Sequence, residues 1–185
     1  MLIGLVLYAG IWGCNTGSTP IALDLMENNT VTDKESQASA PSCHIHLLSI
    51  EDRRLRKNDV GQMNTHPILA KNLKEWLREN LVAHLGPILV LEYTQTPTST
   101  SPVIQLALSL KKMYHHLLLS TQSAIVALEV RLSQDGIYSL PYIIRGRNTS
   151  VNWTGSKDSI QDSFNEAIGS ALNELSSHLN QRCSA

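Results

Sequence analysis

Strong net charge and long basic runs are both missing from this chain of 185 residues. Fifteen Lys and Arg residues stand against sixteen Asp and Glu residues, which leaves a formal net charge of -1. Proteins that bind nucleic acid normally carry a basic patch or stripe that neutralises phosphates. We therefore expect no nucleic-acid partner.

Signatures of catalysis are missing as well. The sequence contains no Gly-x-Ser-x-Gly nucleophile motif and no Gly-rich phosphate-binding loop. His44 and His46 would lie on one face of a strand, but a zinc site needs three or four converging ligands. We interpret these two histidines as part of a solvated strand face, and we expect no enzymatic activity, no metal and no cofactor.

An apolar run long enough to span a bilayer is also missing, since a transmembrane helix needs about 20 apolar residues. The N-terminal apolar run stops at Gly13, and Cys14 and a polar segment follow it. No Lys or Arg precedes this run, although export signals usually begin with a positive charge. A short apolar run that closes on a cysteine is nevertheless typical of a bacterial lipoprotein signal.

We predict a signal peptide at residues 1–13 and a lipidated Cys14 as the first mature residue. Its thiol would carry diacylglycerol, and its freed amine could be acylated too. At about 0.8 kcal/mol per buried methylene, two or three acyl chains would hold the protein at the membrane. An ordinary cleaved signal and a short anchor remain the alternatives.

Cysteine is scarce, with three residues in the chain. Once Cys14 is assigned to lipid, Cys43 and Cys183 remain, near the two ends of the folded part. They could pair in an oxidising periplasm, and the chain-entropy model assigns a loop of this size roughly 4 to 5 kcal/mol. We predict this disulfide, with two unpaired thiols as the alternative.

The mature chain has the length of one domain. Residues 14–42 comprise the lipidated cysteine and a segment rich in Asn, Thr, Ser, Asp and Glu, which we predict to be a flexible tether. Random-coil scaling gives this tether an end-to-end distance of roughly 30 Å. Its one apolar interruption, residues 21–26, could instead dock on the domain as a strand or a short helix. The domain itself is expected over residues 43–185.

Hydrophobic periodicity predicts the elements of this domain. Apolar residues at spacings of three and four predict one helix from Pro67 to Gly86 and another over residues 159–180. Alternation of apolar and polar residues predicts strands, with a tight turn at residues 134–136. The predicted strands are residues 44–50, 88–93, 104–110, 124–132 and 138–144, the last of them ending near Arg145 and Gly146.

The order β-α-β-β-β-β-α favours an α+β fold. We expect an antiparallel sheet of four to five strands with two helices packed on one face. Pro and Thr/Ser-rich residues 94–102 are expected to form a loop.

A set of short motifs carries a family resemblance over residues 43–183. It consists of Ile50-Glu51-Asp52-Arg53-Arg54 at the end of the first strand, Val60-Gly61 before the first helix, residues 142–146, and Trp153 before the final helix. On these motifs the chain resembles the YajG-like family of bacterial lipoproteins. The resemblance implies a membrane-attached protein of a Gram-negative envelope, and it implies fold and place more than activity.

Four residues are candidates for contact with a ligand or partner. Asp52, Arg53 and Arg54 lie at a strand end, where arginine could bind an anionic group in bidentate fashion. The favoured alternative is a local Asp–Arg ion pair that orients the next loop. Trp153 could pack under the final helix or form part of an exposed contact patch.

The sequence thus predicts a non-enzymatic lipoprotein of the outer membrane that faces the periplasm and serves as a binding or assembly module. Its partner would be an envelope protein or lipid. We expect the working surface on the uncovered sheet face or on an edge strand, since an edge can add a partner's strand. The alternative is an accessory subunit of an envelope ABC-type lipid transport system, for which we expect an apolar groove along residues 106–119.

Overall fold

Two long strands form the centre of the molecule, a computed structural model that describes residues 18–26, 43–86, 89–90, 103–151 and 156–183. The predicted signal peptide, Cys14, the loop at residues 94–102 and Trp153 lie outside these residues. Strands β6 (Val103–Leu118) and β7 (Thr121–Gln134) pair antiparallel, and β9 (Tyr142–Val151) pairs antiparallel with the far side of β7. The strands predicted at residues 104–110 and 124–132 are confirmed, and the strand predicted at residues 138–144 is confirmed in part.

The β6–β7 hairpin is longer than the sequence predicts. A β-bulge at Lys111 shifts the register between Leu110 and Lys112. The bulge moves the core-facing positions from even to odd numbers, so Met113 and His115 continue the buried face of Leu110. This change of phase hides the second half of β6 from an alternation pattern.

The other side of β6 carries parallel strands, which the predicted antiparallel sheet did not include. Strand β2 (His44–Asp52) runs parallel to the first half of β6, and β3 (Gly61–Met63) runs parallel to the second half. Strand β5 (Leu89–Val90) adds to β2 in parallel. The parallel pairing of β2 with β6 requires a crossover, and the segment that contains α1 (Leu73–Leu85) provides it.

Over the described residues the sheet is mixed and has nine strands, so it is larger than the predicted four to five strands, and the predicted order of elements is not confirmed. Strand β4 (His66–Lys71) pairs antiparallel with β3, and β1 (Ile21–Asp24) pairs parallel with β4. Strand β8 (Ile137–Tyr138) pairs with the end of β7. The α+β class is confirmed.

The first helix begins later than predicted. Residues 67–71 are extended in β4, and α1 starts at Leu73, after Asn72 with a φ of 56°. Ile68 and Leu73 fit the spacing of a helix, but Ile68 is buried as a strand residue opposite Ile21 of β1. Strand pairing therefore outweighs the helical spacing over this short stretch.

The strand predicted after the turn at Asp135 and Gly136 is interrupted. The turn itself is confirmed, with φ values of 52° and 78°. Strand β8 ends at Tyr138 and β9 begins only at Tyr142, because Pro141 between them has no N–H to donate to a ladder. Leu140, which lies within the strand predicted at residues 138–144, is 89% exposed.

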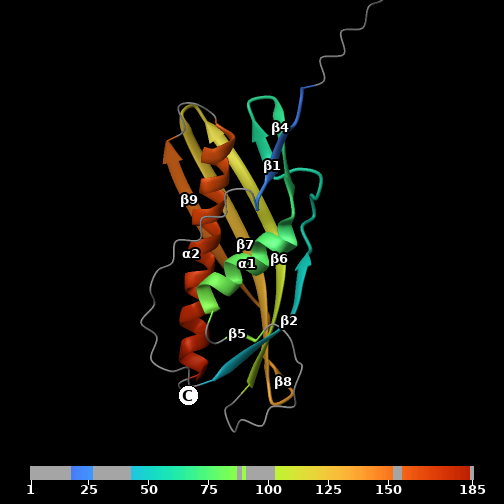
Figure 1. Cartoon of the computed structure of the whole chain (residues 1–185), viewed down its shortest axis with the longest axis vertical. Coiled ribbons are helices and arrows are strands. Elements are labelled where there is room, and N and C mark those ends of the chain that lie inside the picture. The colour runs from blue at the N-terminus through green and yellow to red at the C-terminus, as the bar shows by residue number, and fades with distance from the viewer. Residues whose placement is uncertain (1–17, 27–42, 87–88, 91–102, 152–155, 184–185) are drawn as a thin grey trace, which may run out of the picture.

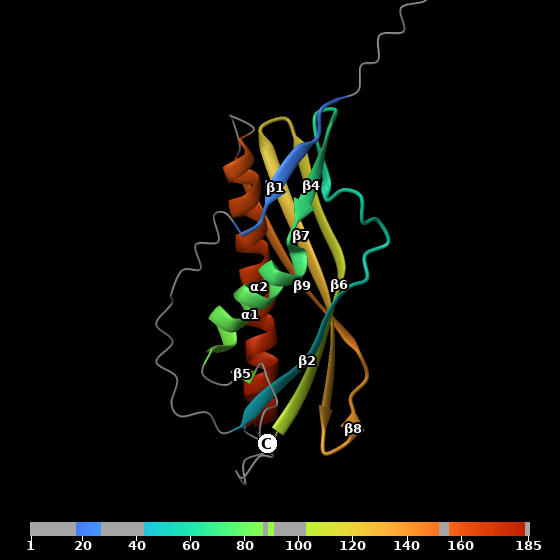
Figure 2. The same ribbon diagram turned by 45° about the vertical axis from the view of Figure 1, so that its right-hand side comes forward.

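Both helices cover the same face of the sheet, as predicted (Figures 1 and 2). Helix α2 (Lys157–Cys183) packs along β7 and β9, and α1 crosses it and lies against β2. The indole Nε1 of Trp76 donates to Asn165 Oδ1 at 2.9 Å, which joins the two helices. Among the described residues, neither helix combines the length and apolarity needed to cross a membrane.

Helix α2 approaches β9 most closely at Gly146. A Cβ atom at this position would lie 1.7 Å from the carbonyl oxygen of Ala167. Only glycine allows the helix backbone to lie this close to the strand. Gly146 therefore sets the distance between the helical layer and the edge of the sheet.

Two features tie the ends of the chain to the domain. Leu23 and Leu25 are fully buried, and β1 pairs with β4 from Ile21↔Ile68 onward, so residues 21–26 of the predicted tether dock as a strand. The predicted disulfide is present between Cys43 and Cys183, with Cα atoms 5.4 Å apart. It joins the start of β2 to the end of α2.

Candidate binding surface

The sheet face opposite the helices is uncovered among the described residues, and we call it the open face. Side chains of a strand alternate between the two faces of the sheet. The residues that alternate with the core-facing residues along each strand therefore belong to the open face. Val126 and Leu128 of β7 point to the helices, and the residues between them point outward. The central open-face residues are Ser109, Lys112, Tyr114 and His116 of β6, Ser123, Ile125, Ala127, Glu129 and Arg131 of β7, and Ile143, Arg145, Arg147 and Thr149 of β9.

Positive charge dominates the open face. Lys112 and Arg145 flank Ala127, and Arg147 lies opposite Ile125. Two further cations, Lys111 from the bulge and Arg131, bind the one carboxylate among these residues, Glu129, at 3.3 Å and 3.0 Å. Five cationic side chains thus share the β6, β7 and β9 part of the open face with one carboxylate, although the whole chain is nearly neutral. Glu51 of β2, opposite Ser109, adds a second carboxylate to this face and is bound by Arg53.

Glu129 is held ionised within this group. Partial burial alone would raise its pKa, but the hydrogen bond and charge of Lys111, followed by those of Arg131, lower the pKa below its ordinary value. The carboxylate therefore stays charged through the physiological pH range and fixes two of the cations in place. The remaining cations, Lys112, Arg145 and Arg147, are exposed.

An apolar and aromatic centre lies among the cations. Tyr114, Ile125 and Ile143 are half-buried. The Lys112 ammonium lies 5.7 Å from the centroid of the Tyr114 ring, and the His116 ring stacks on the same tyrosine at 6.5 Å. A surface of this composition can exclude water at its centre and bind negative charge around it.

The open face continues to an unpaired sheet edge. Among the strands that the structure describes, β9 is paired on one side alone, with β7. The Arg147 Nε donates to the hydroxyls of Ser123 of β7 and Thr149 of β9, each at 3.2 Å, which fixes this side chain beside the edge strand. Cationic side chains commonly protect an edge from pairing with the wrong strand.

The charged cluster predicted at the end of β2 is not a free anion site. Arg54 donates through Nε and Nη2 to the two carboxylate oxygens of Asp52 at 2.9 Å and 3.0 Å, and its side chain is 4% exposed. The Asp52 carboxylate also accepts the Arg54 backbone N–H at 3.1 Å. Arg53 binds Glu51 instead. This geometry supports the local ion pair over a ligand-binding role for Asp52 and Arg54.

The Asp52–Arg54 pair is reflected in the ionisation of the carboxyl group. Burial alone would raise the pKa of Asp52, but the hydrogen bonds and charge of Arg54 outweigh it, so the pKa is lowered. The pair anchors the loop that leads from β2 toward β3.

His44 and His46 both lie on the open-face side of β2, opposite Val103 and Gln105, and the described residues contain no group of three metal-binding side chains.

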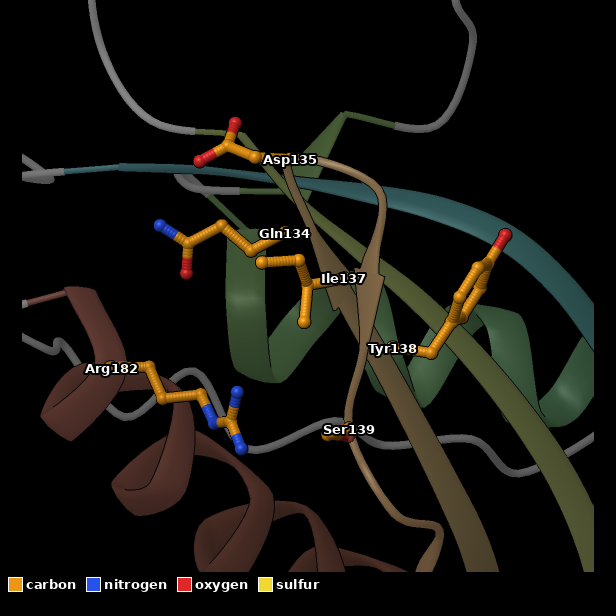
Figure 3. Close-up of a pocket in the computed structure, with 6 residues that line it drawn as sticks. All are labelled: Gln134, Asp135, Ile137, Tyr138, Ser139 and Arg182. Carbon is orange, nitrogen blue, oxygen red and sulfur yellow. The ribbon is translucent and has the colours of Figure 1, made fainter.

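A cavity of about 310 Å³ lies at the far end of the sheet (Figure 3). The β7–β8 turn and the end of α2 form it. Its lining residues are Gln134, Asp135, Ile137, Tyr138, Ser139 and Arg182. Figure 3 places Asp135 and Ser139 at opposite ends of the group, and the Ser139 hydroxyl accepts the Leu132 backbone N–H at 3.3 Å. The lining residues therefore do not form a pair of nucleophile and base.

A buried polar group lies between the second half of the sheet and the start of α2. His115 is fully buried, its Nε2 lies 3.3 Å from Gln122 Oε1, and the Gln122 amide donates to the carbonyl and hydroxyl of Ser159. Burial lowers the pKa of His115, an effect that the hydrogen bond from His115 Nε2 to Gln122 Oε1 partly offsets. His115 is therefore a neutral structural histidine.

The cations of the open face were missed as a group by sequence reasoning. Glu129 and Arg131 stand out only as polar residues that alternate with the core of one strand. Assigning Lys112, Arg145 and Arg147 to the same surface requires the register of three strands and the position of the bulge. The available signal was the alternation in residues 142–149, where Arg145 and Arg147 share one face.

Comparison with known proteins identifies the fold. No family model and no curated protein sequence matches the chain. Among solved structures, a Xanthomonas campestris protein of the DUF330 family superposes with a TM-score of 0.55 at 10% identity, covering 90% of this chain and 94% of that one. A hypothetical protein from Chlamydia trachomatis (TM-score 0.48, 12% identity, 76% and 97% covered) and a minor lipoprotein from Acinetobacter baumannii (0.45, 9%, 75% and 93%) are more distant. The first likeness shows a shared fold, and the predicted YajG-like family stays a prediction.

Proposed function

We propose that this protein is a lipid-anchored, non-enzymatic binding module of the bacterial envelope that works through its open face. One observation carries the proposal: the helices cover one face of the sheet, while the other presents five cations around the apolar centre of Tyr114, Ile125 and Ile143. A monomer has no need of such an exposed combination, and partner surfaces commonly have it.

The anchor is proposed at Cys14, after the signal peptide of residues 1–13. Asn15 follows it, rather than the Asp associated with retention in the inner membrane, which supports a place in the outer membrane facing the periplasm. The Cys43–Cys183 disulfide fits the oxidising compartment that this location implies.

The chemistry of the open face favours an acidic protein partner. Arg145 and Arg147 offer charge-assisted hydrogen bonds to carboxylates. The unpaired edge of β9, the strand that carries both arginines, offers backbone N–H and C=O groups to an added strand. A partner segment that carries Asp or Glu and pairs along β9 would use both features at once.

The alternative role in ABC-type lipid transport lacks the feature expected of it. That role called for an apolar groove along residues 106–119. Leu106, Leu108 and Leu110 are instead buried in the core. The outward-facing residues from Ser109 to His116 are polar, aromatic or cationic, and the exposed apolar Leu118 and Leu119 of this stretch lie at its end, in and beside the β6–β7 turn. No observation on the described residues favours this second function.

The anchor is tested by the intact mass of the mature protein. The full gene would be expressed in a Gram-negative host, and the mass measured with and without a thiol reductant. We expect the mass of residues 14–185 plus acyl chains, with a gain of two hydrogens on reduction. An unlipidated mass, or one that retains residues 1–13, would contradict the anchor and the location.

The open face is tested by photocrosslinking in cells. A photoreactive amino acid would replace Ile125 on the open face or, as a control, the more exposed Leu140 elsewhere. We expect one discrete crosslinked partner from Ile125 that is lost when Arg145→Glu and Arg147→Glu are combined. Equal crosslinking from both positions, or no effect of the charge reversals, would contradict the proposed surface.

A further inference from the structure

One end of the domain gathers the start of β1, two hairpin turns and the end of β9, and we call it the hairpin end. Strand β3 and the second half of β6 run parallel toward it, so the turn at Asn64 lies beside the turn at Leu119. Strands β1 and β4 both run away from it, and Val151 of β9 pairs with Thr121 at the same level (Figure 1). The disulfide and the end of α2 lie at the opposite end.

Three exposed apolar side chains gather at the hairpin end. Leu118 is 65% exposed, Leu119 is 92% exposed and Val151 is 56% exposed. Leu118 and Val151 both flank Thr121 in the register of the sheet, and Leu119 follows directly in the turn. These residues form one apolar tip on the three adjacent strands β6, β7 and β9.

The conformation of Leu119 makes this tip unusual. Its φ of 57° is left-handed, a conformation that disfavours a branched side chain such as leucine. The other hairpin turns use the expected residues in this conformation, Asn64 at 55°, and Asp135 and Gly136 at 52° and 78°. A turn that faces water has no reason to place leucine where asparagine or glycine is better, so Leu119 points to a non-aqueous contact.

The distance along the chain brings this tip to the membrane. Ser18, the first described residue, is four positions after Cys14, and four residue-to-residue steps of extended chain span at most about 14 Å. The Thr19 carbonyl oxygen lies 2.9 Å from His66 Nδ1, and β1 pairs with β4 from Ile21. The start of β1 is thus fixed on the hairpin end, and the anchor must lie close to it.

We infer that the apolar tip of Leu118, Leu119 and Val151 rests in the bilayer surface, so that the domain stands on its hairpin end. The inference builds on the proposed lipid anchor at Cys14. The anchor supplies the attachment and the tip sets the orientation. The open face then lies parallel to the membrane normal. Helix α2 ends at the disulfide, and its 27 residues span about 40 Å, so the disulfide end lies far from the bilayer.

The orientation is tested by site-directed spin labelling of the acylated full-length chain. Cys14 is blocked by lipid and the other two cysteines form the disulfide, so an introduced cysteine is the one free thiol. The variants are Leu119→Cys and Val151→Cys at the hairpin end. Leu140→Cys is the matched control, because Leu140 is equally apolar and 89% exposed but lies toward the other end, beside β8.

The labelled proteins would be reconstituted into vesicles of phosphatidylethanolamine and phosphatidylglycerol. Collision with lipid-soluble oxygen and with a water-soluble nickel chelate would then be compared by power saturation. We expect oxygen to dominate at positions 119 and 151, and the nickel chelate to dominate at position 140. In detergent-free buffer, non-acylated Cys14→Ser protein should show the water-phase signature at all three positions.

Each other outcome counts against the inference. Acylated protein that floats with the vesicles but shows water-phase labels at 119 and 151 would overturn the orientation and leave the anchor intact. Membrane-phase contact at 140 rather than 119 would place the opposite end in the bilayer. Protein without acyl chains by mass would overturn the proposed anchor and this inference together.

Discussion

At the scale of single residues, His115 links stability to pH. Its pKa is lowered because burial disfavours the imidazolium form. The unfolded chain takes up this proton near the ordinary histidine pKa of about 6.5, and the folded protein takes it up only at lower pH. As the pH falls below about 6.5, protonation therefore favours the unfolded state, and the free energy of unfolding declines. The decline stops once the pH is below the pKa of His115 in the folded protein.

The predicted result is a smaller pH dependence in His115→Gln. Urea unfolding of the two proteins between pH 8 and pH 5 should show a decline in wild-type stability that the variant partly lacks. One proton contributes at most about 1.4 kcal/mol per pH unit. His116→Gln, at the exposed neighbouring position, is the control. An unchanged pH slope in His115→Gln would mean that the buried imidazole does not contribute.

Leu119 provides a second prediction at this scale. A left-handed leucine is less stable by about 1 to 2 kcal/mol than one in a favoured region, and asparagine tolerates the conformation better. Leu119→Asn should therefore raise the free energy of unfolding of the non-acylated Cys14→Ser protein in buffer by up to about 1 kcal/mol. Leu118→Asn, in the strand before the turn, should give no such gain. A loss of stability in Leu119→Asn would indicate that the leucine packs on the protein itself.

Single residues also mark how far the sequence could be interpreted. The pairing of Cys43 with Cys183 was predictable because the chain has three cysteines, and the assignment of Cys14 to a lipid left these two. The ion pair of Asp52 and Arg54 was predictable as the favoured alternative. The exposure of Leu140 was missed, because the alternation of apolar residues was followed through Pro141, although a proline within a strand pattern is itself a sign of an interrupted ladder.

At the scale of elements, the contact of α2 with β9 depends on Gly146. Any side chain there meets the Ala167 carbonyl oxygen and pushes the helix off the sheet. Gly146→Ala should destabilise the protein by about 1 to 3 kcal/mol, the usual range for overpacking, or more. Chemical denaturation measures the change.

Gly169→Ala is the matched control for Gly146→Ala, because Gly169 lies on α2, the helix that packs against Gly146 of β9. Its added Cβ would lie 3.5 Å from His84 Nε2, an ordinary contact. Alanine in a helix interior is favoured over glycine by up to about 1 kcal/mol, so this variant should be neutral or slightly more stable. Equal destabilisation by both substitutions would contradict a special role for Gly146.

Periodicity predicts elements better than it predicts their neighbours. The alternation in β7 and the apolar stripe of α2 each identify a face, and these elements were predicted nearly in full. Alternation does not say which strand lies beside which, so the parallel pairing of β2 with β6 was out of reach. A residue such as Ile68, which fits both periods, was assigned to the wrong element for the same reason.

At the scale of the whole molecule, the Cys43–Cys183 disulfide closes nearly the entire domain. The bond spans 140 residues, and a loop of this length is worth about 5 kcal/mol in the chain-entropy model, although measured values often fall in the range of about 2 to 5 kcal/mol. The Cys43→Ser and Cys183→Ser double variant should lose stability in this range by chemical denaturation. Reductant should destabilise the wild type similarly and leave the double variant unchanged. A double variant as stable as wild type would show that the bond adds nothing to the fold.

The docking of β1 also controls how far the domain can stand from its own Cys14. When β1 is paired with β4, only the few residues before Ser18 connect Cys14 to the domain. If β1 were released from β4, the connection from Cys14 would extend to Cys43, a fully extended length of about 100 Å. A pull on the N-terminus acts along the axis of β1 and loads its pairs with β4 in shear, all at once rather than one after another. The four paired residues of β1 therefore determine the reach between Cys14 and the domain.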